Sequence, residues 1–148
     1  MSLTAILMLA ASALPQSAPC EPSVAGSVAL VRRFYTTALV EKRVREGFER
    51  DVSADLIEHK PDIATGDRTG AITFLEGLVA ALPGAKWELL RVTGDANLVA
   101  VHARFVPARG APSFAIADFF RVEGCKIVEH WDVVADQPKN PANRLPRF

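Results

Sequence analysis

The sequence lacks an excess of charge of either sign, because 17 lysines and arginines balance 17 aspartates and glutamates. A neutral chain without a basic run has no electrostatic attraction for a phosphate backbone, so we expect no nucleic-acid partner. It also lacks a glycine-rich phosphate loop of the GxxxxGKS kind. Two cysteines are too few for a zinc site, and the three histidines lack the close helical spacing of zinc motifs, so we expect no metal.

Long apolar runs are also scarce. Residues 1–14 are apolar and uncharged but too few to span a bilayer, so we expect no membrane span. They are typical of a secretory signal, with Ala11-Ser12-Ala13 as its cleavage site, although a basic start is missing. We therefore interpret residues 1–22 as a signal peptide and linker and expect export to the periplasm or the medium. A frayed tail on a cytoplasmic protein is the alternative.

The two cysteines could pair in an exported protein. Cys20 lies among three prolines, in a segment typical of a loose linker, and Cys125 lies near the other end of the chain. We therefore expect the two to stay unpaired.

The remaining chain has the composition of one globular domain, expected over residues 23–136, followed by an irregular tail at 137–148. Apolar residues recur at helical spacing within 28–39, 44–52 and 72–82, with a loop at 53–70. From residue 86 the period changes to two, which predicts strands at 86–93, 98–106, 113–122 and 127–135. Helices followed by hairpin-linked strands indicate an α+β fold with an antiparallel sheet. Both faces of the last two strands are partly apolar, so we expect helices on one face and a partner subunit on the other.

Two ionisable residues stand out within those last strands. Asp118 shares a strand face with Ile116 and Phe120, and His130 shares one with Asp132. An odd-numbered turn at Glu123 to Lys126 would place Asp118 across from His130 and an even-numbered one would not; the sequence leaves this open. A carboxylate on an apolar face needs a partner, and a histidine paired with it suits general acid–base chemistry. A purely structural hydrogen-bonded pair is the alternative.

Other polar and aromatic residues complete the candidate set. His59 precedes Lys60-Pro61 in a loop that proline makes stiff enough to aim a side chain. His102 shares a strand face with Leu98, Ala100 and Arg104. The aromatic residues that we expect in the core or the wall of a pocket are Phe34, Trp87, Phe105 and Phe120.

Several stretches together resemble the SnoaL-like, polyketide-cyclase-like branch of the nuclear-transport-factor-2-like superfamily. They are VRRFYTTAL, LIEHKPDIATG, AVHARF and ADFFRVEGCKIVEHWDVV, within residues 28–136. The last stretch is the most specific. Two departures from the family pattern are Lys60, where asparagine is usual, and Gly124-Cys125, where Asn-Gly is usual.

The resemblance implies a cone-shaped α+β barrel, with N-terminal helices packed in a strongly bent antiparallel sheet around a deep pocket. It also implies proton-transfer chemistry without a cofactor, and a homodimer formed through the outer sheet face. Carried over by position, His59, Asp118 and His130 are the expected catalytic residues. Asp132 and His102 are expected to contact substrate, together with the four aromatic residues.

These observations lead to a working hypothesis and two alternatives. The hypothesis is a small cofactor-free enzyme, a lyase or isomerase, that performs aldol-type cyclisation or isomerisation on a hydrophobic carbonyl compound. The first alternative is a non-catalytic domain that binds a small hydrophobic molecule. The second is a structural domain in which Asp118 and His130 only satisfy each other.

Overall fold

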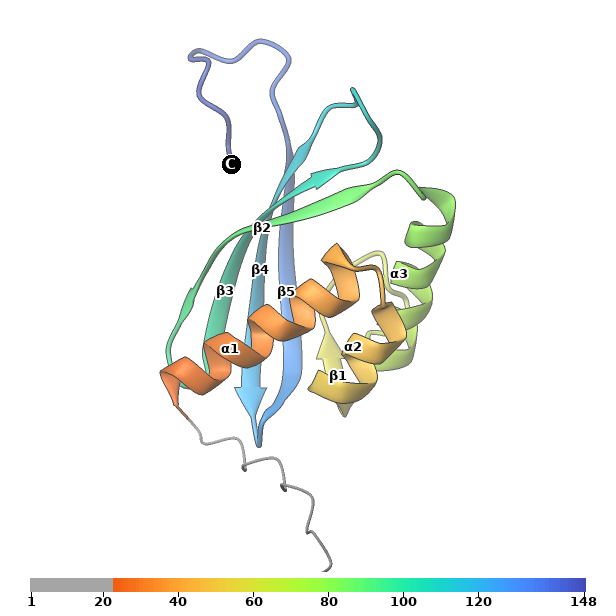
Figure 1. The fold of residues 1–148 in the computed structure, drawn as a ribbon, viewed down its shortest axis with the longest axis vertical. Coiled ribbons are helices and arrows are strands. Elements are labelled where there is room, and N and C mark those ends of the chain that lie inside the picture. The colour runs from red at the N-terminus through yellow and green to blue at the C-terminus, as the bar shows by residue number, and fades with distance from the viewer. Residues whose placement is uncertain (1–22) are drawn as a thin grey trace, which may run out of the picture.

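The computed structural model describes residues 23–148, so the expected signal peptide and linker lie outside the described residues. Three helices and a π-helical turn pack against one face of a bent five-stranded sheet (Figure 1). The helical elements are α1 (Val24–Tyr35), η1 (Thr36–Val40), α2 (Val44–Asp51) and α3 (Arg68–Ala81). The strands are β1 (Val52–Glu58), β2 (Lys86–Gly94), β3 (Leu98–Val106), β4 (Phe114–Glu123) and β5 (Lys126–Asp136). Within the described residues, no helix is both long enough and apolar enough to cross a membrane.

The sheet has the strand order β1-β5-β4-β3-β2. Strands β2 to β5 pair antiparallel, as the sequence predicts, whereas β1 pairs parallel with β5. The prediction of a loop over residues 53–70 and of a wholly antiparallel sheet is therefore wrong. β1 is an edge strand with an irregular register, and three consecutive residues in it are partly or fully exposed. Its sequence consequently lacks the alternation that marks a strand.

The helices begin at capping residues that the local sequence supplies. The Ser23 hydroxyl accepts a hydrogen bond from the Gly26 amide at 3.0 Å, and the Asp67 carboxylate accepts one from the Gly70 amide at 2.8 Å. Each satisfies an amide that the first helical turn leaves without a partner. The apolar side of α1 packs on the inner sheet face, where Val31 and Tyr35 are fully buried.

The hairpin between β4 and β5 determines which side chains face the helices. Gly124 and Cys125 both have positive φ, 51° and 64°, so a two-residue turn of type I′ joins the strands. Such an even turn alone would move His130 to the outer face. A β-bulge follows, in which Val122 pairs with Ile127 while Arg121 pairs with Glu129. The extra residue in β5 shifts the side chains after it to the opposite face of the sheet, so His130 returns to the inner face.

As a result, Asp118 pairs directly with Asp132, and Phe120 pairs with His130. All four side chains share the inner face, so Asp118 and His130 are diagonal rather than direct neighbours.

Cys125 is disulfide-bonded, so the expectation that both cysteines stay unpaired fails there. Cys20 lies outside the described residues.

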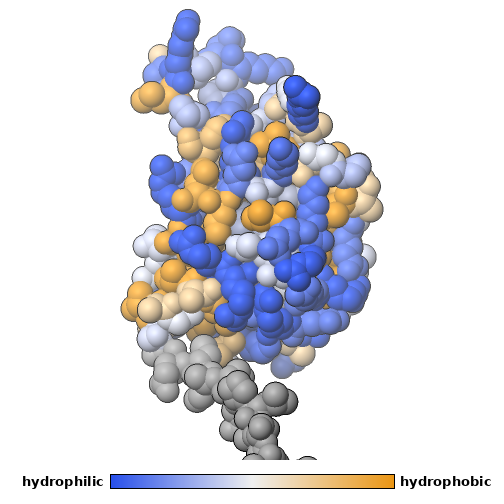
Figure 2. Space-filling model, in the orientation of Figure 1, coloured by the Kyte–Doolittle hydropathy of each residue, from blue (hydrophilic) through white to orange (hydrophobic). Residues whose placement is uncertain are grey.

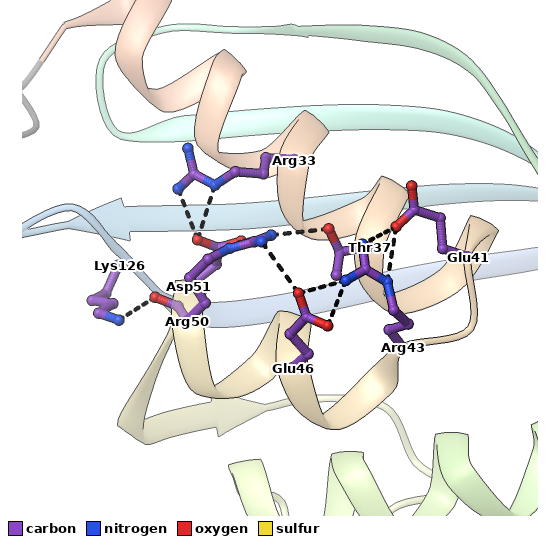
Figure 3. Close-up of polar contacts among 8 residues, drawn as sticks. All are labelled: Arg33, Thr37, Glu41, Arg43, Glu46, Arg50, Asp51 and Lys126. Atoms are coloured by element: carbon purple, nitrogen blue, oxygen red, sulfur yellow. Dashed lines mark hydrogen bonds and ion pairs between the residues drawn. The ribbon is translucent and has the colours of Figure 1, made fainter. Parts of the chain in front are cut away.

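A buried carboxylate joins the first two helices. The Asp51 side chain is 1% exposed and accepts hydrogen bonds from Arg33 at 2.7 Å and from Arg50 at 2.8 Å (Figure 3). Arg50 also donates to the Thr37 hydroxyl at 2.9 Å, and the Lys126 ammonium donates to the Arg50 carbonyl. The network therefore fixes α2 against α1 and against the start of β5. Figure 2 shows the hydrophilic surface that these charges create over α2.

We expect the Asp51→Ala substitution to lower the free energy of unfolding by about 2–3 kcal/mol, because the buried carboxylate loses hydrogen bonds to two charged donors. Glu49→Ala, which removes an exposed carboxylate two residues earlier in the same helix, should change it by less than about 0.5 kcal/mol. Urea unfolding of both variants measures the difference. Equal stability of the two variants would show that the network does not hold the helices together.

Candidate active site

A cavity of about 210 Å³ lies between the helices and the inner face of the sheet. Most of its wall is aromatic or aliphatic. Phe34 contacts Phe48 edge to face at 5.0 Å and Phe120 at 5.8 Å between ring centroids. Trp87 and Phe105 lie 4.6 Å apart and also line it. The structure thus places all four predicted pocket aromatics on the cavity wall.

One side of the cavity holds a chain of ionisable residues. His130 lies between two acidic side chains: its Nδ1 donates to the Glu58 carboxylate at 2.9 Å and its Nε2 donates to Asp118 Oδ1 at 3.2 Å. The Glu58 and Asp118 side chains are 4% and 8% exposed. Two carboxylates this deeply buried need a cation between them.

The charge on His130 follows from this arrangement. Burial by itself disfavours the imidazolium, but hydrogen bonds to Asp118 and Glu58 outweigh burial and raise the pKa of His130 from 6.5 to about 9. The residue is therefore an imidazolium at neutral pH, with both N–H groups already donated. It cannot accept a proton there, so its part in the site is to hold and neutralise the acids.

Two polar atoms in the cavity wall lack a well-formed hydrogen bond. Tyr35 Oη and Asp118 Oδ2 are both buried and form no hydrogen bond of ordinary geometry with the described residues. Burial, and after it the charge of Asp118 and a side-chain hydrogen bond with it, raise the pKa of the Tyr35 hydroxyl well above its usual value, so the two groups are close although their contact falls outside ordinary hydrogen-bond geometry. Tyr35 is thus a neutral hydrogen-bond donor close to the Asp118 carboxylate, whose Oδ2 can accept a hydrogen bond from a ligand. Unsatisfied buried groups are costly, and such a pair is suited to a ligand that supplies the missing partner.

A second ion pair lies in the cavity wall. The Lys60 ammonium contacts Asp132 at 2.7 Å and Asp62 at 3.3 Å, and lies 5.7 Å from the centre of the Phe74 ring. Burial opposes its charge, but the Asp132 and Asp62 carboxylates prevail and raise the pKa of Lys60. The lysine that departs from the family pattern therefore compensates the charge of Asp132.

Two predicted site residues lie elsewhere. His59 is on the outer side of the sheet, where its ring stacks on Trp131 at 4.9 Å and donates to Glu129 at 2.8 Å. His102 accepts from Arg91 and donates to the Arg147 carbonyl, each at 2.9 Å. Neither lines the cavity. The structure therefore does not bring His59, expected to be catalytic, or His102, expected to contact substrate, together with Asp118 and His130, because the contacts of both rings lie outside the cavity.

Three residues of the site were missed in the sequence. Tyr35 lies on the apolar stripe of the first predicted helix, where only its bulk was considered. Glu58 belongs to the unrecognised strand β1; reading residues 52–58 as a strand would have placed it on the same face as Leu56. Lys60 was treated only as a departure from a motif. Among the described residues, no group of three His, Cys, Asp or Glu side chains is arranged to hold a metal ion.

Fold and site together define a small α+β protein with an apolar cone and a buried acid–imidazolium network at its wall. The chain belongs to the SnoaL-like domain family, whose model matches residues 31–130. No curated protein matches the sequence at a significant level.

Solved structures have the same nuclear-transport-factor-2-like fold. IdmH from Streptomyces antibioticus, a candidate polyketide cyclase, is 19% identical over 72% of this chain and 89% of that chain, with a TM-score of 0.60. A candidate ketosteroid isomerase from Kribbella flavida is 19% identical over 81% and 90%, with a TM-score of 0.62. AclR from Streptomyces galilaeus, a candidate hydroxylase, is 21% identical over 76% and 90%, with a TM-score of 0.61. At these identities the likeness shows the fold alone.

The charge of His130 makes stability depend on pH. A folded-state pKa of about 9 against 6.5 means that the stabilisation is complete below about pH 6.5 and is lost as the pH rises through 9. The difference corresponds to about 3 kcal/mol. We expect wild type to lose more unfolding free energy than His130→Gln between pH 6.5 and 9.5, as measured by urea unfolding. An NMR titration in which the His130 ring becomes neutral near pH 6.5 would contradict this account.

Proposed function

We propose that this protein is a cofactor-free enzyme that moves a proton next to the carbonyl group of a small hydrophobic compound. The observation that carries the proposal is the close but poorly formed contact of Tyr35 with Asp118 in the wall of an apolar cavity, which leaves Tyr35 Oη and Asp118 Oδ2 without a well-formed hydrogen bond. One is a donor and the other an acceptor. A ketone needs both: a donor for its oxygen and a base for the hydrogen on the adjacent carbon.

The proposed roles follow from the contacts of each residue. Asp118 Oδ2 removes the proton, and the Tyr35 hydroxyl donates to the oxygen on which negative charge develops. His130 is a positioning residue: its hydrogen bond to Asp118 Oδ1 fixes the carboxylate and directs Oδ2 to the substrate. Glu58 holds the far side of the imidazolium. Proton return from Asp118 to another carbon would complete an isomerisation, and attack of the enolate on a second carbonyl would give aldol-type cyclisation.

The main alternative is a domain that binds the same kind of ligand without changing it. Both imidazole nitrogens of His130 are engaged by carboxylates, so the network is as complete as a purely structural one would be. Binding would then need only Tyr35 Oη and Asp118 Oδ2. Proton exchange separates this alternative from catalysis, because a binder leaves the hydrogens of its ligand in place.

We expect the purified protein to speed hydrogen–deuterium exchange at the carbon next to the carbonyl group of a small neutral cyclic ketone, such as cyclohexanone. Asp118→Asn should reduce the rate at least 100-fold and Tyr35→Phe at least tenfold, because the first removes the base and the second one oxyanion donor. His59→Ala, outside the cavity, is the matched control and should retain wild-type exchange. NMR of the ketone in D₂O measures the exchange rate with each of the four proteins. Exchange by Asp118→Asn at the wild-type rate would exclude Asp118 as the base.

We also propose self-association through the outer sheet face, which exposes Phe119 and Val133 at 37% and 61% of their surfaces. Apolar side chains exposed together on a sheet are typical of an interface. Sedimentation analysis should find a dimer for wild type and a monomer for Val133→Asp, with Glu49→Ala as the control. A monomeric wild-type protein at micromolar concentration would contradict this.

We also propose that the protein is exported to the periplasm or the medium. The disulfide at Cys125 supports it, because disulfides persist mainly in oxidising compartments.

A further inference from the structure

The charged groups around the cavity do not balance. In the part of the chain that the structure describes, the cavity lining contains four carboxylates and two cations. In the deeper group, Glu58 and Asp118 share the single charge of His130. In the other, Asp132 and Asp62 share the single charge of Lys60. Each group therefore has one negative charge in excess when all its acids are ionised.

Among residues 23–148, no arginine lines the cavity to compensate this excess. Arg33 of α1 and Arg50 of α2 are both bound to Asp51, which is not a cavity residue. The excess charge therefore acts on whatever enters the cavity.

The apolar wall strengthens this effect. Charges inside a protein interact through a much lower effective dielectric constant than in water, and salt screens them weakly. An anionic ligand would lose its hydration and gain no unshared cation in return. A neutral ligand avoids that cost, and a cationic one is attracted.

We propose that the cavity selects uncharged and cationic ligands and rejects carboxylates and phosphates of the same size and shape. Asp132 contributes most of the selection in the outer group, because its side chain is 10% exposed whereas that of Asp62 is 63% exposed. Combined with the proposed function, on which this one step rests, the substrate is a carbonyl compound without an acidic group. An apolar cavity of about 150 Å³ holds benzene, so about 210 Å³ suits a single substituted ring.

Three ligands of one shape test the selection at pH 8: 4-ethylphenol, 4-ethylbenzylamine and 4-ethylbenzoate. Calorimetry should show that the benzoate binds at least tenfold more weakly than the phenol, and the amine at least as tightly as the phenol. Equal affinity for the phenol and the benzoate, or an amine weaker than the benzoate, would overturn the proposal.

Matched variants locate the effect. Asp132→Asn should raise affinity for the benzoate at least fivefold and change that for the phenol by less than twofold. Asp62→Asn should act in the same direction but less, and it remains informative if Asp132→Asn fails to fold. Glu49→Gln removes one exposed charge outside the cavity and should change nothing. Unchanged benzoate binding in both folded cavity variants would contradict the assignment.

These binding measurements are independent of turnover. Loss of exchange activity together with retained charge selection would remove the proposed reaction and leave this inference intact. Normal exchange activity with no charge selection would remove this inference and leave the proposed reaction intact.

Discussion

The imidazolium of His130, held between two buried carboxylates, is the interaction on which the site depends. It joins three strands that meet on the inner face of the sheet: Glu58 ends β1, Asp118 lies in β4 and His130 lies in β5. Removing that charge would leave two acids in an apolar interior, where each is strongly destabilised unless it takes up a proton. The burial of the acids and the charge of the histidine therefore require each other.

The backbone makes this meeting possible through a compensation between two local features. The type I′ turn at Gly124-Cys125 uses an even number of residues and would alone direct His130 outward. The bulge that follows adds one residue and returns His130 to the side of Asp118. A change to either feature, without a matching change in the other, would separate the pair. The turn keeps two residues, Gly124 and Cys125, where the family pattern has Asn-Gly, so its length still matches the bulge.

The remaining architecture keeps a cavity open beside this network. Aromatic side chains from α1, α2, β2 and β4 form a wall rather than filling the space, and Tyr35 and Asp118 each keep one polar atom unsatisfied there. Such atoms lower stability in the empty protein, which is a common feature of binding sites. The Asp51 network, which lies outside the cavity, holds α1 and α2 together.

Periodicity was enough to predict the three helices and strands β2 to β5, because their apolar residues repeat with a clear period. It failed for β1, whose exposed edge and irregular pairing hide the alternation. The same failure explains the errors at the site. Without β1, neither the inward direction of Glu58 nor the outward direction of His59 could be inferred, and the resemblance alone placed His59 in the pocket. The sequence could not decide whether Asp118 and His130 face the same side of the sheet, because no sequence pattern predicts a bulge.

A crystal structure of the protein with 4-ethylphenol bound would test the central claim most directly. The expected result is a phenol oxygen within hydrogen-bond distance of both Tyr35 Oη and Asp118 Oδ2, with His130 still between Asp118 and Glu58. A phenol bound elsewhere while the cavity stays empty, or an Asp118 side chain turned to solvent, would contradict the account.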